Sequence, residues 1–195
     1  MSRNLLLAAI TVICLAFLLV PTFTQGKPPQ AAGTTVSADQ IKRGEYLVYI
    51  GLCHDCHTPK KMGPKGPEPD MSKKLAGHLS TTRVPEVPAN VIGPDKWGAL
   101  GNNDFTAWAG PWGVSFAANL TSDEETGIGT WNEAMFIKAM RTGKHLGEGR
   151  DILPPMPWPW IAMMTDDDLK AIFAYLKSVP PIKNPVPDPI PPMGQ

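Results

Sequence analysis

Residues 53–57 read Cys-His-Asp-Cys-His, and this stretch decides what the rest of the chain must be built around. Two thiols three positions apart lie on one side of a single helical turn, and a histidine directly follows the second. The C-x-x-C-H pattern is the attachment signature of c-type haem, in which each thiol forms a thioether to one porphyrin vinyl group. The spacing therefore predicts one covalently bound haem c, with Cys53 and Cys56 as the thioether sites and His57 as the proximal iron ligand.

Two other uses of paired thiols are less favoured by the surrounding sequence. A structural zinc site needs four ligands, and the remaining histidines, His54, His78 and His145, are not spaced as in a zinc finger. A thioredoxin-type C-x-x-C belongs in a βαβ context, for which we find no pattern. The third cysteine, Cys14, lies in an N-terminal apolar run, so we expect no disulfide framework.

A haem iron bound by one histidine needs a second axial ligand or keeps an open site. Residues 153–160 read Leu-Pro-Pro-Met-Pro-Trp-Pro-Trp, which places Met156 among prolines that fix φ and beside large aromatic side chains. We predict Met156 as the distal iron ligand. His145, Met163 and Met164 are its rivals, and Met156 as a core-filling side chain is the remaining alternative.

The chain divides by composition into segments of different character. Residues 1–25 begin with a charged start and an apolar stretch, as in an export signal. No Ala-x-Ala cleavage site follows, so an N-terminal membrane anchor is the alternative. Residues 26–36 are predicted to be a linker, residues 37–179 the folded domain and residues 180–195, with seven prolines, an extended tail. Either interpretation of the N-terminus exports the domain to the periplasm, free or anchored to the inner membrane.

Three helices are predicted within the domain from their capping residues and apolar spacing. Ser37 with Gln40 opens the first, the Thr130-Trp131-Asn132-Glu133 box opens the second, and Thr165 opens the third. Residues 60–118 carry Gly and Pro at short intervals and are predicted to be a loop insertion. We find no strand pattern. The 18 basic residues balance the 18 acidic ones, which argues against a nucleic-acid partner.

Several stretches together resemble the class I c-type cytochromes. Within them, the chain is similar to single-haem domains like those of the cytochrome c subunits of bacterial membrane-bound alcohol and gluconate dehydrogenases. The matching stretches are Arg43–Leu47, Cys53–Pro59, Ala118–Thr121, Glu125–Gly129, Pro155–Pro157 and Leu169–Val179.

The resemblance implies an all-α cytochrome c fold, with three to four helices around a covalently attached haem and long Gly/Pro-rich loops. It implies that the first and last helices cross near the haem edge, with Gly44 permitting their close approach. It also implies thioethers at Cys53 and Cys56, His57 as the proximal ligand and Met156 as the distal one.

The expected function is electron transfer by an exported monohaem carrier in a bacterial respiratory chain, with no enzyme activity of its own. Its partners would be a redox protein donor and acceptor, such as a membrane-bound dehydrogenase or oxidase. Two alternatives stay open. One is a haem subunit that works only inside a dehydrogenase complex. The other is a five-coordinate haem protein with peroxidase or gas-sensing activity.

Overall fold

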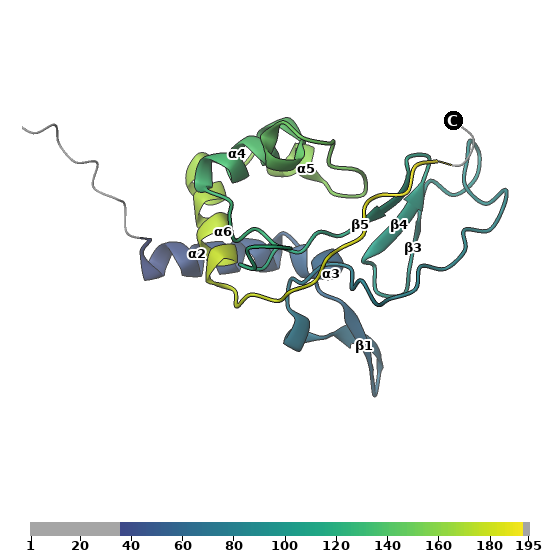
Figure 1. Cartoon of the computed structure of the whole chain (residues 1–195), viewed down its shortest axis with the longest axis horizontal. Coiled ribbons are helices and arrows are strands. Elements are labelled where there is room, and N and C mark those ends of the chain that lie inside the picture. Colours follow the sequence, from purple (N-terminus) through teal and green to yellow (C-terminus); the bar gives the residue numbers. More distant parts are fainter. Residues whose placement is uncertain (1–35, 193–195) are drawn as a thin grey trace, which may run out of the picture. The chain divides into compact units, whose positions relative to one another are not determined.

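A computed structural model describes residues 36–192 of the chain (Figure 1). The predicted signal peptide or anchor of residues 1–25 lies outside the described residues, as do the three C-terminal residues. The helices are α2 (Ala38–Ile50), α3 (Cys53–His57), α4 (Glu133–Thr142), α5 (Trp158–Ile161) and α6 (Asp166–Ser178), with 3-10 turns η1 (Met71–Lys73) and η2 (His145–Gly147). The strands are β1 (Lys60–Gly63), β2 (Gly66–Pro69), β3 (Leu100–Gly101), β4 (Ala107–Gly110) and β5 (Gly113–Phe116).

The prediction of an all-α fold is therefore wrong: the described residues form a mixed α/β structure with two small antiparallel sheets. All five strands lie in residues 60–118, for which the sequence predicts a loop. β1 pairs with β2, and β3, β4 and β5 pair in that order. No strand is longer than four residues, so none produces an apolar alternation long enough to recognise. The two-residue loops Pro64-Lys65 and Pro111-Trp112, followed by glycines with positive φ, close the hairpins.

The capping predictions hold for the first and last of the long helices. The Ser37 hydroxyl accepts a hydrogen bond from the Gln40 amide at 3.1 Å, and the Thr165 hydroxyl accepts one from the Asp168 amide at 3.2 Å. The middle helix begins later than predicted, because Asn132 rather than Thr130 is the N-cap. Asparagine is the stronger N-cap of the two, and its side-chain oxygen accepts from the Met135 amide at 2.9 Å.

Helices α2 and α6 cross in close contact, and Gly44 makes the crossing possible. A Cβ atom at Gly44 would lie 1.8 Å from the carbonyl oxygen of Ala171 and 2.8 Å from the Tyr175 Cβ. The hydrophobic core lies at and around this crossing. Its main side chains are Leu47 and Val48 of α2, Phe136 and Met140 of α4, and Leu169, Ile172, Phe173 and Leu176 of α6. The predicted apolar stripe on the last helix is thus buried.

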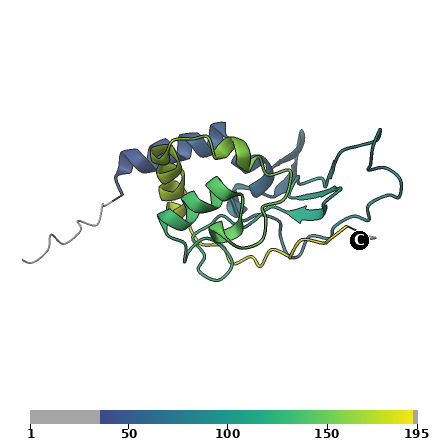
Figure 2. The ribbon, with the colours of Figure 1, turned by 90° about the horizontal axis from the view of Figure 1, so that it is seen from above.

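The segment after α6 is attached along the domain (Figure 2). Ile190 forms an antiparallel bridge with Val114 of β5, with amide-to-carbonyl distances of 2.8 and 2.9 Å. The buried Asn184 side chain donates to the carbonyls of Ala76 and His78 and accepts from the Ser80 amide. These bonds attach the segment after α6 to the segment that follows η1. Within residues 36–192 we find no helix with the length and apolar character to cross a membrane.

Candidate functional site

The two cysteines and the histidine of the C-x-x-C-H motif lie on the single turn of helix α3. Leu52, in the left-handed region at φ 55°, turns the chain sharply between α2 and α3. Cys53 and Cys56 are both partly buried free thiols. Burial raises the pKa of Cys53 to about 11 and also raises the pKa of Cys56. Both are therefore protonated at neutral pH, unlike the low-pKa thiolates of disulfide oxidoreductases.

His57 is buried and held in one tautomer by a backbone carbonyl. Its Nδ1 lies 2.8 Å from the carbonyl oxygen of Ala118. A carbonyl can only accept, so Nδ1 carries the hydrogen and the Nε2 of the neutral ring keeps its lone pair. Burial is the largest influence on the His57 pKa and lowers it, which keeps the ring neutral at pH 7. Imidazoles that bind metals in proteins usually have their second ring nitrogen donating to a carbonyl or carboxylate, as Nδ1 of His57 does here.

The inserted segment supplies that carbonyl by returning to α3. The Gly77 amide donates to the His57 carbonyl at 2.8 Å, and the His78 amide donates to the Ala117 carbonyl at 2.9 Å. A Cβ at Gly77 would lie 2.4 Å from the Ala117 carbonyl oxygen, so the close approach requires glycine. The backbone of residues 75–78 and 117–118 is therefore held next to α3, where the Ala118 carbonyl orients the His57 ring.

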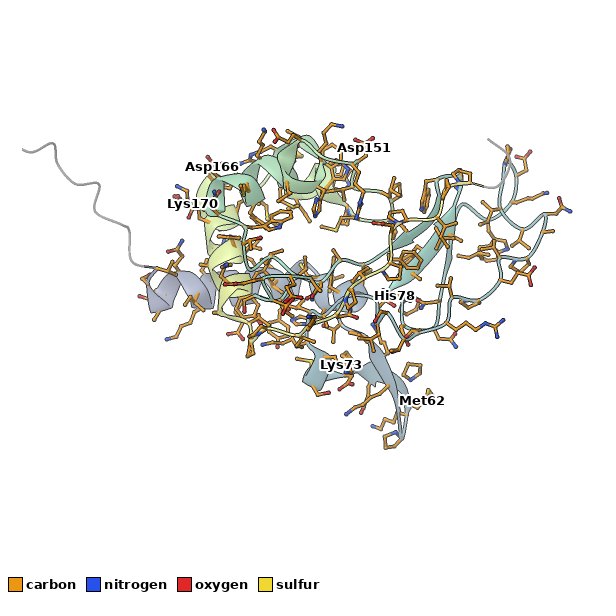
Figure 3. The ribbon with its side chains drawn as sticks, in the orientation of Figure 1. Met62, Lys73, His78, Asp151, Asp166 and Lys170 are labelled. Atoms are coloured by element: carbon orange, nitrogen blue, oxygen red, sulfur yellow. The ribbon has the colours of Figure 1, made fainter. Side chains whose placement is uncertain are left out.

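The other two buried histidines are oriented by threonines instead. His54 Nδ1 lies 2.9 Å from Thr58 Oγ1, and its ring packs 4.7 Å from that of Tyr49. His78 (Figure 3) is fully buried, with Nδ1 2.9 Å from Thr106 Oγ1. Among residues 36–192, no group of three or more His, Cys, Asp or Glu side chains could hold a metal ion. The zinc alternative gains no support from this geometry.

Met156 lies in the loop before α5 and is partly buried against the hydrophobic core, which Cys53 also contacts. In Figure 1, α4 and α5 lie above α3. Of the rival ligands, Met163 is 77% exposed, and the exposed His145 packs edge-on to the Trp131 ring at 5.2 Å. Met164 is partly buried against the core. Met156 and Met164 are therefore the two candidate ligands whose thioether side chains are partly buried.

Comparison with known proteins gave several cytochrome subunits of dehydrogenases among the relatives, although no family model matches the chain. The gluconate 2-dehydrogenase cytochrome c subunit of Pantoea cypripedii is 32% identical over 135 residues, 69% of this chain and 22% of that protein. The cytochrome c subunit of the quinone alcohol dehydrogenase of Gluconobacter oxydans is 28% identical over 171 residues, 85% of this chain and 28% of that protein. The chain is similar to cytochrome c subunits of dehydrogenases. The predicted resemblance is confirmed.

The likeness to these cytochrome c subunits covers most of the chain but little of each relative. The fructose dehydrogenase cytochrome subunit of Gluconobacter japonicus is 25% identical over 178 residues, 91% of this chain and 29% of that protein. The chain therefore spans less than a third of the length of the relatives it matches.

Two contributors to this cytochrome-like site had no signal in the sequence. The Ala118 carbonyl is a backbone group, and any residue type could have supplied it. Ser115 belongs to the stretch Gly113–Phe116, which forms β5 and contacts the Met156 loop. A serine hydroxyl in a Gly-rich stretch resembles an ordinary turn residue, so only the folded chain reveals what it touches.

Proposed function

We propose that this chain is a monohaem c-type cytochrome that transfers electrons and catalyses no reaction of its own. Cys53 and Cys56 would hold haem c through thioethers, His57 Nε2 would bind the iron as the proximal ligand, and Met156 would bind it as the distal ligand. The observation that carries the proposal is the His57 Nδ1 hydrogen bond to Ala118, which frees Nε2 in a ring that shares the α3 turn with two thiols of raised pKa. The likeness to dehydrogenase cytochrome c subunits supports it independently.

The residues of the site have separate tasks in this proposal. The bound haem supplies a one-electron iron couple. The Ala118 carbonyl keeps the His57 ring from rotating and raises the basicity of its free nitrogen. The buried side chains of the core pack against Met156 and Cys53 and would help to exclude water from the haem. A thioether from Met156 favours the reduced iron and leaves no position for oxygen.

The proposed partner and compartment are supported by the relatives and by the N-terminal sequence. The named relatives are cytochrome subunits of dehydrogenases, so a membrane-bound dehydrogenase or oxidase of a respiratory chain is the proposed partner. Residues 1–25 export the domain to the periplasm and are cleaved or remain as an inner-membrane anchor. Reduction of the ferric protein by membranes supplied with alcohol or gluconate would support this partner. Failure with every dehydrogenase substrate would contradict it.

Expression of the full chain alongside the cytochrome c maturation machinery tests the haem assignment. We expect a coloured protein whose mass exceeds that of the polypeptide by one haem. The haem should stay attached when the protein is denatured. A pyridine haemochrome spectrum should indicate two thioethers in the native sequence and one in Cys53→Ser or Cys56→Ser. A colourless protein of polypeptide mass would overturn the proposal.

The distal ligand is tested by the visible spectrum of the ferric protein. We expect a low-spin spectrum with the weak long-wavelength band of an iron–thioether bond, lost in Met156→Ala. Met163→Ala is the matched control, because Met163 is exposed and should leave the band unchanged. Loss of the band in Met164→Ala instead would reassign the ligand. A high-spin native protein that binds carbon monoxide without displacing a ligand would favour the five-coordinate alternative.

A further inference from the structure

The loop that carries Met156 is poor in hydrogen-bond donors. Residues 153–157 read Leu-Pro-Pro-Met-Pro, so three of the five residues have no N–H. Within the loop, the Met156 amide donates to the Leu153 carbonyl at 3.3 Å. Among the described residues, the only hydrogen bond between residues 153–156 and another segment comes from Ser115. Apart from the packing of Met156 against the core, the position of this loop therefore depends on a hydrogen bond that its own sequence does not supply.

Ser115 is buried on β5, and its hydroxyl lies 2.5 Å from the carbonyl oxygen of Pro154. The same hydroxyl oxygen lies 3.3 Å from the Trp112 Nε1 and 3.4 Å from the Trp108 carbonyl. A hydroxyl has one hydrogen, and the shortest contact is to Pro154, so Ser115 donates there and accepts from the Trp112 indole. The Trp112 indole therefore donates to the Ser115 hydroxyl, which in turn donates to the Pro154 carbonyl in the Met156 loop.

The strand that presents Ser115 is held from both sides. Trp108 of β4 is its register partner, and the neighbouring Val114 exchanges two backbone hydrogen bonds with Ile190 of the C-terminal segment. The hydroxyl is thus carried by a strand with backbone partners on both edges rather than by a free loop. A rigid donor fixes the position of a carbonyl better than a mobile one, since less conformational entropy opposes the bond.

We propose that Ser115 is a positioning residue that holds the Met156 loop in place through the Pro154 carbonyl, and would thereby strengthen the bond between Met156 and the haem iron. This inference rests on the proposed function. It assigns a role to the strands of the inserted segment: they supply a donor to a loop whose prolines cannot. Ser115 acts through the Pro154 carbonyl, two residues before the thioether, and touches neither haem nor iron itself.

The consequence is measurable as competition for the distal position. An external ligand such as imidazole must displace Met156, and the loop then loses its contact with Ser115. The Ser115 bond stabilises only the state with Met156 bound. Its loss should therefore make ferric protein bind imidazole about five- to tenfold more tightly, the factor expected for one net hydrogen bond.

The experiment is an imidazole titration of the ferric, haem-loaded full chain, followed at the long-wavelength iron–thioether band. We compare Ser115→Ala, Ser115→Thr and Ser115→Val with the native sequence. Threonine and valine have nearly the same shape and differ in the hydroxyl, so this pair keeps the test valid if the alanine variant does not fold. We expect native affinity in Ser115→Thr and tighter imidazole binding in Ser115→Ala and Ser115→Val.

Ser122→Ala is the matched control. The Ser122 hydroxyl donates to the Val179 carbonyl at 2.7 Å, a similar long-range bond that does not involve the Met156 loop. We expect it to lower the melting temperature without changing imidazole affinity. Equal affinities in Ser115→Thr and Ser115→Val, or an equal shift in Ser122→Ala, would overturn the inference. Absence of the band in the native protein would instead overturn Met156 ligation, so the two failures are distinguishable.

Discussion

Replacing Gly44 with alanine tests the tightest backbone approach in the helical part of the domain. The added Cβ would lie 1.8 Å from the Ala171 carbonyl oxygen and 2.5 Å from its carbonyl carbon, whereas real Cβ atoms stay at least 3.0 Å from such neighbours. The obstructing atoms belong to the backbone of α6, so no side chain can rotate away. The two helices must separate by roughly 1 Å, and the packing between them must loosen.

The net effect is the balance of two opposing contributions. Overpacking a tight contact costs about 1–3 kcal/mol, and a clash with backbone belongs at the upper end of that range. Alanine is better than glycine in a helix interior by about 1 kcal/mol, which offsets part of the cost. We expect Gly44→Ala to lower the free energy of unfolding by about 2 kcal/mol. For a domain of this size the melting temperature should fall by roughly 4–8 °C.

The measurement is unfolding of the purified full chain by heat and by urea, followed by far-ultraviolet circular dichroism. Gly98→Ala is the control, because a Cβ at Gly98 would meet no atom within 4 Å. That variant should be unchanged or slightly stabilised, since alanine restricts the unfolded chain. If Gly44→Ala is as stable as the native sequence, or gains the full helix-propensity benefit, then α2 and α6 do not cross as closely as described and the reasoning fails.

Three further predictions concern a cap, the C-terminal segment and pH. Thr165→Ala removes the N-cap of α6 and should destabilise the protein by about 1 kcal/mol, measured by urea unfolding; an unchanged midpoint would contradict the cap. Asn184→Ala leaves two buried carbonyls without their donor and should destabilise by about 2–4 kcal/mol, with faster proteolysis of the C-terminal segment. Stability should also decline as pH falls below 6.5, the ordinary pKa of histidine, because burial lowers the pKa of His78 and the unfolded state then binds more protons. His78 contributes at most about 1.4 kcal/mol per pH unit, so His78→Gln should flatten the slope, and an equally steep slope in the variant would refute the assignment.

The helices could be predicted because their signals are local. Ser37 and Thr165 cap through side-chain oxygens three residues from their partners, and the stripe on α6 repeats at helical spacing. The boundary of α4 was misplaced because two residues compete as caps within three positions, and the competition is decided by backbone geometry. The strands could not be predicted, since their pairing brings short segments together through tight turns rather than through a repeating pattern.

The C-x-x-C-H motif could be read for the same local reason: three side chains on one turn of helix need no tertiary contact to be adjacent. Met156 could be singled out only by its proline-rich neighbourhood, and its rivals stayed open until burial separated Met163 and His145 from it. The mixed α/β architecture was missed because an all-α family resemblance says nothing about an insertion that the resembling stretches do not cover.

Local sequence was enough to identify the pair of thiols, the adjacent imidazole, the helix caps and the apolar faces, because each depends on residues within one or two helical turns. Tertiary structure alone decided which carbonyl orients His57 and which hydroxyl reaches the Met156 loop. Those contacts join positions 61 and 39 residues apart in the chain. A hydrogen bond between residues so far apart in the chain depends on how the intervening backbone folds back. Every residue has a backbone carbonyl, so no residue type in the sequence indicates which carbonyl will accept the bond.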